Sequence, residues 1–166
     1  MTNRELRKLY GAFFRAEGLV TKRCYIGPNY VIVIYEGCQY YIVLDTKRNY
    51  DGMCFQMFTY GPEFVIWEDS PGYWEDDPEL EGKVRDAANK VNALQTLGRV
   101  HANSAVTYRV DIRLQSREQF KDFFYKAARA LKAVEQDFIE ELRNIGVFWK
   151  PSSEPCEIGE RIISEL

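Results

Sequence analysis

The stretch that decides the fold is residues 84–113, VRDAANKVNALQTLGRVHANSAVTYRVDIR, which a second helical pattern follows from Ser116. Its first half has apolar residues at helical spacing, and Gly98 ends that pattern. Its second half alternates apolar and polar residues over 106–113, which is typical of a strand with one buried face. The turn at Asn103-Ser104 joins two such strands into a hairpin. The stretch therefore predicts a helix, a hairpin and a second helix, in that order. It contains no group of residues typical of a catalytic site.

Two helices flank that hairpin. The first has Asp77 as its N-cap and Pro78 at its first position, and runs to about residue 97. We expect it to bury Leu80, Val84, Ala87, Val91 and Leu94. The second starts with the capping-box spacing of Ser116 and Gln119 and continues to about residue 145. Its apolar stripe is Phe120, Phe123, Phe124, Ala127, Leu131, Val134, Phe138 and Leu142. Phe123, Phe124, Leu131 and Val110 are expected in the core.

The N-terminal half predicts one more helix and a set of strands. Thr2 and Glu5 form a capping box that opens a helix over 3–16. Strand patterns follow at 19–26, 30–35, 39–44 and 53–60, with connections too short for parallel crossovers. We therefore predict an α+β fold, an antiparallel meander sheet of five or six strands packed with three helices. The expected order is α-β-β-β-β-α-β-β-α, in a single domain over 1–146, with a C-terminal tail over 147–166 that has room for a short helix.

The order of these elements resembles the YbjN-like proteins and, more distantly, the type III secretion chaperone fold. The resemblance is carried by Val91-Asn92-Ala93-Leu94, then Gly98-Arg99-Val100, then Arg109-Val110-Asp111-Ile112 before the long amphipathic helix. It covers about residues 2–145. The segment 61–80 departs from the pattern as an insertion, and the tail 146–166 is an addition. The resemblance implies an α+β fold that is often dimeric, and it provides no catalytic residues to transfer.

Composition indicates an ordinary globular protein. The chain has 166 residues, 46% of them hydrophobic and 28% charged, with a formal net charge of −3. It shows no basic stripe, so we expect no nucleic-acid partner. It has no apolar run as long as the ~18 residues of a transmembrane helix and no apolar leader after Met1, so we expect a cytoplasmic protein without a membrane contact.

The residues that usually carry chemistry form no recognisable motif. His101 is the only histidine and stands alone on a predicted hairpin strand. The four cysteines form no Cys-x-x-Cys pair, which favours buried thiols over a metal site or a disulfide framework. The sequence has no glycine-rich phosphate loop and no EF-hand pattern. We expect no catalytic residues, no metal and no cofactor.

Residues 61–82 are the unusual segment, since they are rich in Asp and Glu and contain no Lys or Arg. They also contain Trp67, Tyr73 and Trp74. Aromatic side chains beside charges are typical of recognition surfaces, so we expect these three rings to be partly exposed and to bind a partner. Arg109 and Arg113, on the polar face of the second hairpin strand, are the further candidates. The alternative is that the Trp rings fold back as a lid over the sheet.

Two functional classes remain. The first is a non-catalytic protein-binding module, chaperone-like or regulatory, that presents a sheet or groove to a protein or peptide. The second is a small enzyme with an unrecognised carboxylate or tyrosine site. Composition favours the first.

A homodimer is the expected assembly. A hairpin leaves a sheet edge that must be covered, charged or paired, and the helix before it carries small residues that allow close approach. We predict a twofold contact through Ala87, Ala88, Val91 and Tyr108. The alternative is a monomer in which the acidic segment 61–80 covers the same surface.

Overall fold

The computed structural model describes residues 1–24, 30–48, 50–64, 74–103 and 105–150. Its helices are α1 (Asn3–Ala16), α2 (Pro78–Leu94) and α3 (Phe120–Asn144). Its strands are β1 (Val20–Cys24), β2 (Tyr30–Tyr35), β3 (Cys38–Val43), β4 (Cys54–Tyr60), β5 (Glu63–Phe64), β6 (Arg99–Ala102), β7 (Val106–Arg113) and β8 (Trp149–Lys150). None of the helices in these ranges is long and apolar enough to cross a membrane.

Six of the strands form one antiparallel sheet in the order β1-β2-β3-β4-β7-β6. The short strands β5 and β8 pair separately. The predicted α+β class, the antiparallel meander and the order of helices and long strands are confirmed. The domain continues past the predicted boundary at residue 146, because Val147 is buried and β8 pairs with β5. The short helix predicted further along the tail lies outside the described residues.

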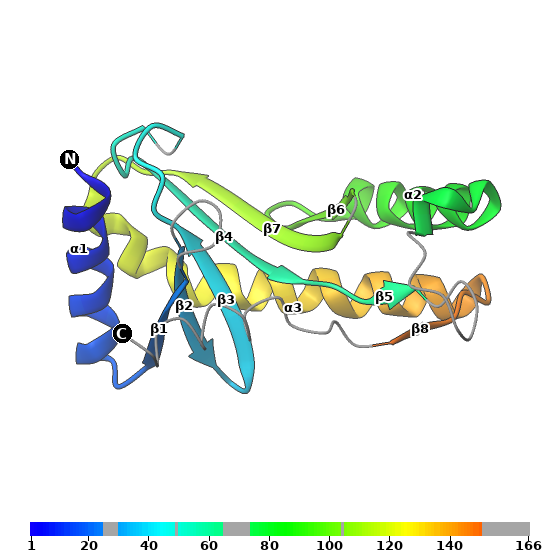
Figure 1. Cartoon of the computed structure of the whole chain (residues 1–166), viewed down its shortest axis with the longest axis horizontal. Helices are drawn as coiled ribbons and strands as arrows, with labels where there is room; N and C mark the ends of the chain where they lie inside the picture. The colour runs from blue at the N-terminus through cyan, green and yellow to red at the C-terminus, as the bar shows by residue number, and fades with distance from the viewer. Residues whose placement is uncertain (25–29, 49, 65–73, 104, 151–166) are drawn as a thin grey trace.

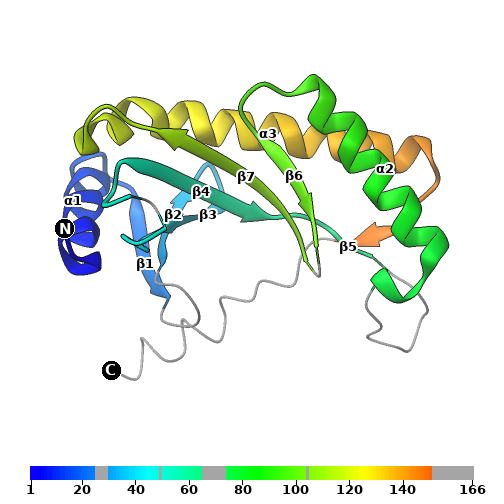
Figure 2. The same cartoon turned by 90° about the horizontal axis from the view of Figure 1, so that it is seen from above.

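The helix α3 covers one face of this sheet, and α1 and α2 lie at its two ends (Figures 1 and 2). The helix α3 runs along the sheet and contacts β4, β6 and β7, while α1 contacts β1 and β2 at one end and α2 contacts β6 and α3 at the other. The core between the layers includes Phe124, Leu131 and Val110, each 0% exposed, as predicted. Phe123 is partly buried and packs against this core, with the Lys126 ammonium 5.5 Å from its ring centroid, so it is less buried than the other three. The predicted burial of Leu94 is wrong, since it is the last residue of α2 and is 77% exposed.

Local side-chain hydrogen bonds set the helix starts. Glu5 N donates to Thr2 Oγ1 at 3.2 Å and Thr2 N donates to Glu5 Oε2 at 2.7 Å, which confirms the first capping box. Asp77 caps α2 by accepting from two backbone amides. The second predicted box is wrong, because Ser116 makes no side-chain cap and Gln119 instead accepts from Gln115 N at 2.8 Å. A 3-10 turn, Arg117–Gln119, comes before α3.

The outer edge of the hairpin is covered by α2. The side chain of Asn92 accepts from Val100 N at 2.7 Å and donates to Val100 O at 2.9 Å, as a neighbouring strand would. Arg85 Nη1 donates to Ala102 O at 3.0 Å. The edge is therefore satisfied within the chain, by α2 rather than by a second copy.

The predicted dimer residues are part of the core instead. Ala87, Ala88, Val91 and Tyr108 are 0–4% exposed. The small residues of α2 allow close packing on α3 and β6 of the same chain. These four side chains therefore offer no surface to a second copy, and their assignment to a dimer contact is wrong. A homodimer through the helix expected over 78–97 and the hairpin after it stays a prediction for the other side chains of these elements.

Candidate functional site

The main sheet opens between β3 and β4. Strands β2 and β3 pair from Tyr30↔Val43 to Tyr35↔Cys38, and β4 pairs with β7 along its whole length. In contrast, β3 and β4 pair only at Tyr41↔Phe58 and Ile42↔Met57. Toward the start of β3 and the end of β4 the strands separate, and there Thr59 Oγ1 donates to Gln39 O at 2.8 Å. This opening is called the β3–β4 split below.

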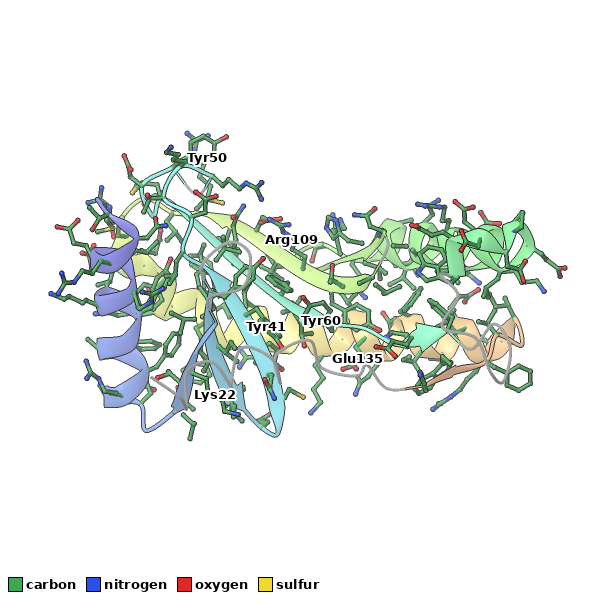
Figure 3. The ribbon with its side chains drawn as sticks, viewed as in Figure 1. Lys22, Tyr41, Tyr50, Tyr60, Arg109 and Glu135 are labelled. Atoms are coloured by element: carbon green, nitrogen blue, oxygen red, sulfur yellow. The ribbon has the colours of Figure 1, made fainter. Side chains whose placement is uncertain are left out.

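A cavity of about 370 Å³ occupies the β3–β4 split. Two strand segments form its walls, Gly37–Tyr41 on the β3 side and Thr59–Pro62 on the β4 side. Three side chains of α3 and one of β8 complete it, namely Lys132, Glu135, Ile139 and Trp149. Figure 3 shows Tyr41, Tyr60 and Glu135 close together at this place in the molecule. The cavity therefore combines aromatic rings and two opposite charges.

Glu135 is the most unusual group in this cavity. Its side chain is half-buried, and burial raises the pKa of its carboxyl above the ordinary value, while Lys132 on the preceding turn lowers it to a smaller extent. Within the described residues, the Glu135 carboxylate makes no hydrogen bond and no ion pair. Lys132 has a different carboxylate nearby, with its Nζ 3.9 Å from Glu36 Oε2. A desolvated carboxylate without a partner is costly, so this position favours a ligand that supplies one.

Tyr40 and Tyr108, whose hydroxyls feel the charge of Glu135, are neutral. Tyr40 is 3% exposed, and burial raises the pKa of its hydroxyl, with a further rise from Cys38. Tyr108 lies on the neighbouring side of the core, where burial followed by the charge of Glu135 raises the pKa of its hydroxyl. Among the described residues the Tyr108 hydroxyl has no hydrogen-bond partner. Tyr40, which lines the cavity, therefore contributes a neutral hydroxyl rather than a phenolate charge.

The predicted partner-binding residues are distributed differently. Trp74 is 5% exposed, packs edge-on against Phe64 at 5.8 Å between ring centroids and has the Arg85 guanidinium 5.6 Å from its ring, so its predicted exposure is wrong. The sequence pattern suggested exposure because its neighbours are acidic, but Glu75 pairs with Arg85, which lies over the ring, and Asp77 caps α2. Trp67 and Tyr73 lie outside the described residues.

Arg109 and Arg113 lie on the sheet face away from α3. Arg109 is partly exposed and its Nε lies 3.1 Å from Asp111 Oδ2, while Arg113 is exposed. The alternation of β7 explains this placement, since Tyr108, Val110 and Ile112 take the inner face. The structure does not bring these arginines to Trp74, which packs with the core on the helix side. Their role in partner binding stays a prediction.

The sheet face away from α3 also carries an apolar cluster that sequence reasoning did not single out. Its buried members are Ile32, Tyr41, Val43 and Phe58, with Tyr30 and Tyr60 packed against them. Tyr41 and Phe58 stack with ring centroids 5.0 Å apart. Phe58 is the strand partner of Arg109, so the cluster borders the predicted arginine surface. Tyr41 and Tyr60 belong both to this cluster and to the cavity.

The remaining candidate groups do not assemble around a reaction centre. His101 is half-buried, and burial, followed by the charge of Arg109, lowers its pKa. Cys38 and Cys54 are free thiols, and burial raises the pKa of Cys54, so this thiol is protonated at neutral pH. In the described part of the chain, no group of three His, Cys, Asp or Glu residues is placed to hold a metal ion.

Glu135 was missed by the sequence reasoning, although the sequence does contain a signal. Leu131, Glu135, Phe138 and Leu142 follow one another at steps of four, three and four residues, so the glutamate occupies an apolar stripe position. A charged residue at such a position is either paired or next to a cavity. The β3–β4 split left no comparable signal in the sequence.

Comparisons with known proteins do not indicate a function. No family model matches the chain, and no curated protein is similar to it. Among solved structures, it is similar to an uncharacterized protein from Methanothermobacter thermautotrophicus, at 12% identity and a TM-score of 0.48. The match covers 84% of this chain and 97% of the other. A likeness at that level carries no functional argument.

Proposed function

We propose that this chain is a non-catalytic protein-binding module, chaperone-like or regulatory, that receives a peptide segment of its partner in the β3–β4 split. The observation that carries the proposal is the limited pairing of β3 with β4 beside a cavity of about 370 Å³. An extended segment lying along the split would direct alternate side chains toward this cavity. The floor of the split is part of α3, which the core holds in place.

The fold resemblance belongs to the same proposal. The order of helices and long strands is the one on which the resemblance to YbjN-like proteins and to the type III secretion chaperone fold rests. A chaperone-like fold is consistent with a protein that acts by holding another chain. The resemblance supports the class of function and does not name the partner.

A library of twelve-residue peptides displayed on phage and selected on the full chain tests the proposal. Enriched peptides should bind the wild-type protein and should lose at least tenfold in affinity for Ile139→Trp, which fills the cavity from α3. The control is Leu94→Trp, at a position that is 77% exposed and outside the cavity lining. Both variants should keep the wild-type circular dichroism spectrum. Peptides that bind both variants equally, or a selection without enrichment, would refute the proposal.

A small enzyme is the second candidate, and one observation favours it. A half-buried carboxyl whose raised pKa comes from burial is the kind of group that acts as a general acid. The test is a screen of ester, phosphate and glycoside model substrates with the wild type and with Glu135→Gln. Turnover that disappears in Glu135→Gln would replace the binding proposal. Turnover that both proteins share would come from a contaminant or another site.

A further inference from the structure

We propose that the cavity in the β3–β4 split binds a cationic group, the ammonium of a lysine or the guanidinium of an arginine side chain, with Glu135 as its counter-ion. This inference rests on the proposed function and specifies which side chain of the bound segment the cavity selects. It follows from the charges, the walls and the size of the cavity.

The charge balance favours a cation. Among the described residues that line the cavity, the charged side chains are Glu135 and Lys132. Lys132 is exposed and lies 3.9 Å from Glu36, whereas the Glu135 carboxylate makes no hydrogen bond or ion pair in the described part of the chain. Of these two lining charges, only Lys132 has an opposite charge within ion-pair distance among the described residues, at Glu36. A ligand cation would therefore compensate the carboxylate that folding leaves half-buried and unpaired.

The walls suit the rest of such a side chain. Tyr40, Tyr60 and Trp149 contribute aromatic rings, and aromatic faces attract ammonium and guanidinium groups. The Trp149 ring already has the Arg143 guanidinium 5.9 Å from its centroid, which shows that a cation fits beside it. Ile139 and Pro62 offer apolar contact to an aliphatic stem. The combination of a half-buried carboxylate and apolar walls matches a long side chain with a charge at its end.

The size is also appropriate. A volume of about 370 Å³ lies at the lower end of the ~300–1,000 Å³ typical of ligand pockets. It accommodates one long side chain together with some water. The cavity is too small for more than one side chain of a bound protein, which agrees with the peptide binding of the proposed function.

The first experiment uses a small probe. Nα-acetyl-lysine methylamide is titrated into the full, ¹⁵N-labelled chain, and Nα-acetyl-norleucine methylamide serves as the neutral probe of similar shape. We expect the lysine probe to shift the backbone amides of Gly37, Gln39 and Gly61 and to bind about tenfold more tightly than the norleucine probe, as a charge-assisted contact worth ~1.4 kcal/mol predicts. Equal binding of the two probes, or shifts confined to other amides, would overturn the inference.

Three variants make the assignment to Glu135 specific. Glu135→Gln should remove the preference for lysine over norleucine, and Lys132→Met should increase it because the nearest competing cation is gone. Glu140→Gln, an exposed residue of the same helix outside the cavity lining, should leave it unchanged. If Glu135 and Lys132 had only structural roles, replacing them would not change the preference for the lysine probe in opposite directions. A preference that survives in Glu135→Gln would overturn the inference.

The display experiment separates this inference from the proposed function. Enriched peptides should contain a lysine or arginine, and replacing it with norleucine should weaken binding about tenfold. If the replacement has no effect while Ile139→Trp still abolishes binding, the peptide groove stands and the cation pocket is refuted. If no peptide is enriched but the lysine probe binds in a Glu135-dependent way, the cation site stands and the peptide-binding function is refuted.

Discussion

Replacing Gly98 by alanine should destabilise the protein, whereas replacing Gly82 by alanine should stabilise it. A Cβ on Gly98 would lie 2.6 Å from Val134 Cγ2 and 3.2 Å from the backbone oxygen of Ala130, both on α3. Carbon atoms in contact prefer about 3.5–4.0 Å, and Val134 is 0% exposed with a stiff β-branched side chain, so the connection to β6 must move away from α3. Such overpacking costs about 1–3 kcal/mol. The lower entropy of the unfolded alanine chain offsets about 0.4–1 kcal/mol of this.

Gly98→Ala should therefore lose about 1–2 kcal/mol of unfolding free energy, which lowers the melting temperature by about 2–8 °C. Gly82 is the matched control, because it lies inside α2 and a Cβ there would have nothing within 4 Å. Gly82→Ala should gain about 0.5–1 kcal/mol. Urea unfolding followed by circular dichroism measures both. A Gly98→Ala protein as stable as the wild type would refute the close approach of the connection to α3.

Three further predictions concern the core, the cavity and the sheet edge. Phe124→Ala should lower the free energy of unfolding in urea by about 3–5 kcal/mol, because the ring is fully buried. Phe148 is 83% exposed, so Phe148→Ala should change this free energy by less than about 0.5 kcal/mol. Similar losses in the two variants would contradict the assigned core. Glu135→Gln should be more stable than the wild type at neutral pH and not at a pH well below the unfolded-state pKa of Glu. The reason is that burial raises the pKa of Glu135 in the folded state, so the wild type loses stability as the pH rises from the unfolded-state pKa through the folded-state pKa. A difference between the two urea midpoints that does not change with pH would contradict this. Asn92→Ala should lose about 1–3 kcal/mol by leaving Val100 N and O without their partner and should show concentration-dependent association in sedimentation equilibrium; a monomer of unchanged stability would contradict the role of Asn92 at the edge.

The helices and long strands were predictable because their signals are local. The capping box at Thr2 and the Asp77 cap with Pro78 each satisfy amides within three residues, so sequence spacing alone places them. The alternation of β7 likewise fixes which side chains face α3. The same local reasoning failed at Ser116, because the Gln119 side chain bonds one residue earlier in the chain, at Gln115.

Burial and pairing were harder to predict because they depend on neighbours distant in sequence. Leu94 continues the apolar spacing of α2, but the helix ends there and the side chain is exposed. Trp74 stands among acidic residues, yet Phe64 and Arg85 enclose its ring. The small residues of α2 suit a helix contact equally well within one chain or between two. Only the position of α3 decides between these alternatives, and it places Ala88 and Val91 inside.

The candidate site arises from one such non-local choice. β4 pairs with β7 along its whole length and β3 pairs with β2 along its whole length, whereas β3 and β4 pair with each other at two positions. The stripe of α3 passes beneath the resulting opening, and the stripe position that meets it is Glu135 rather than an apolar residue. Leu131 and Phe138, the neighbouring stripe positions, are apolar and fully buried. A glutamate leaves a half-buried carboxylate without a partner in the described structure, which natural sequences tend to keep only where a site needs the charge. The coincidence of an unpaired acid with a split sheet is therefore the strongest physical reason to look for this protein's ligand at the β3–β4 split.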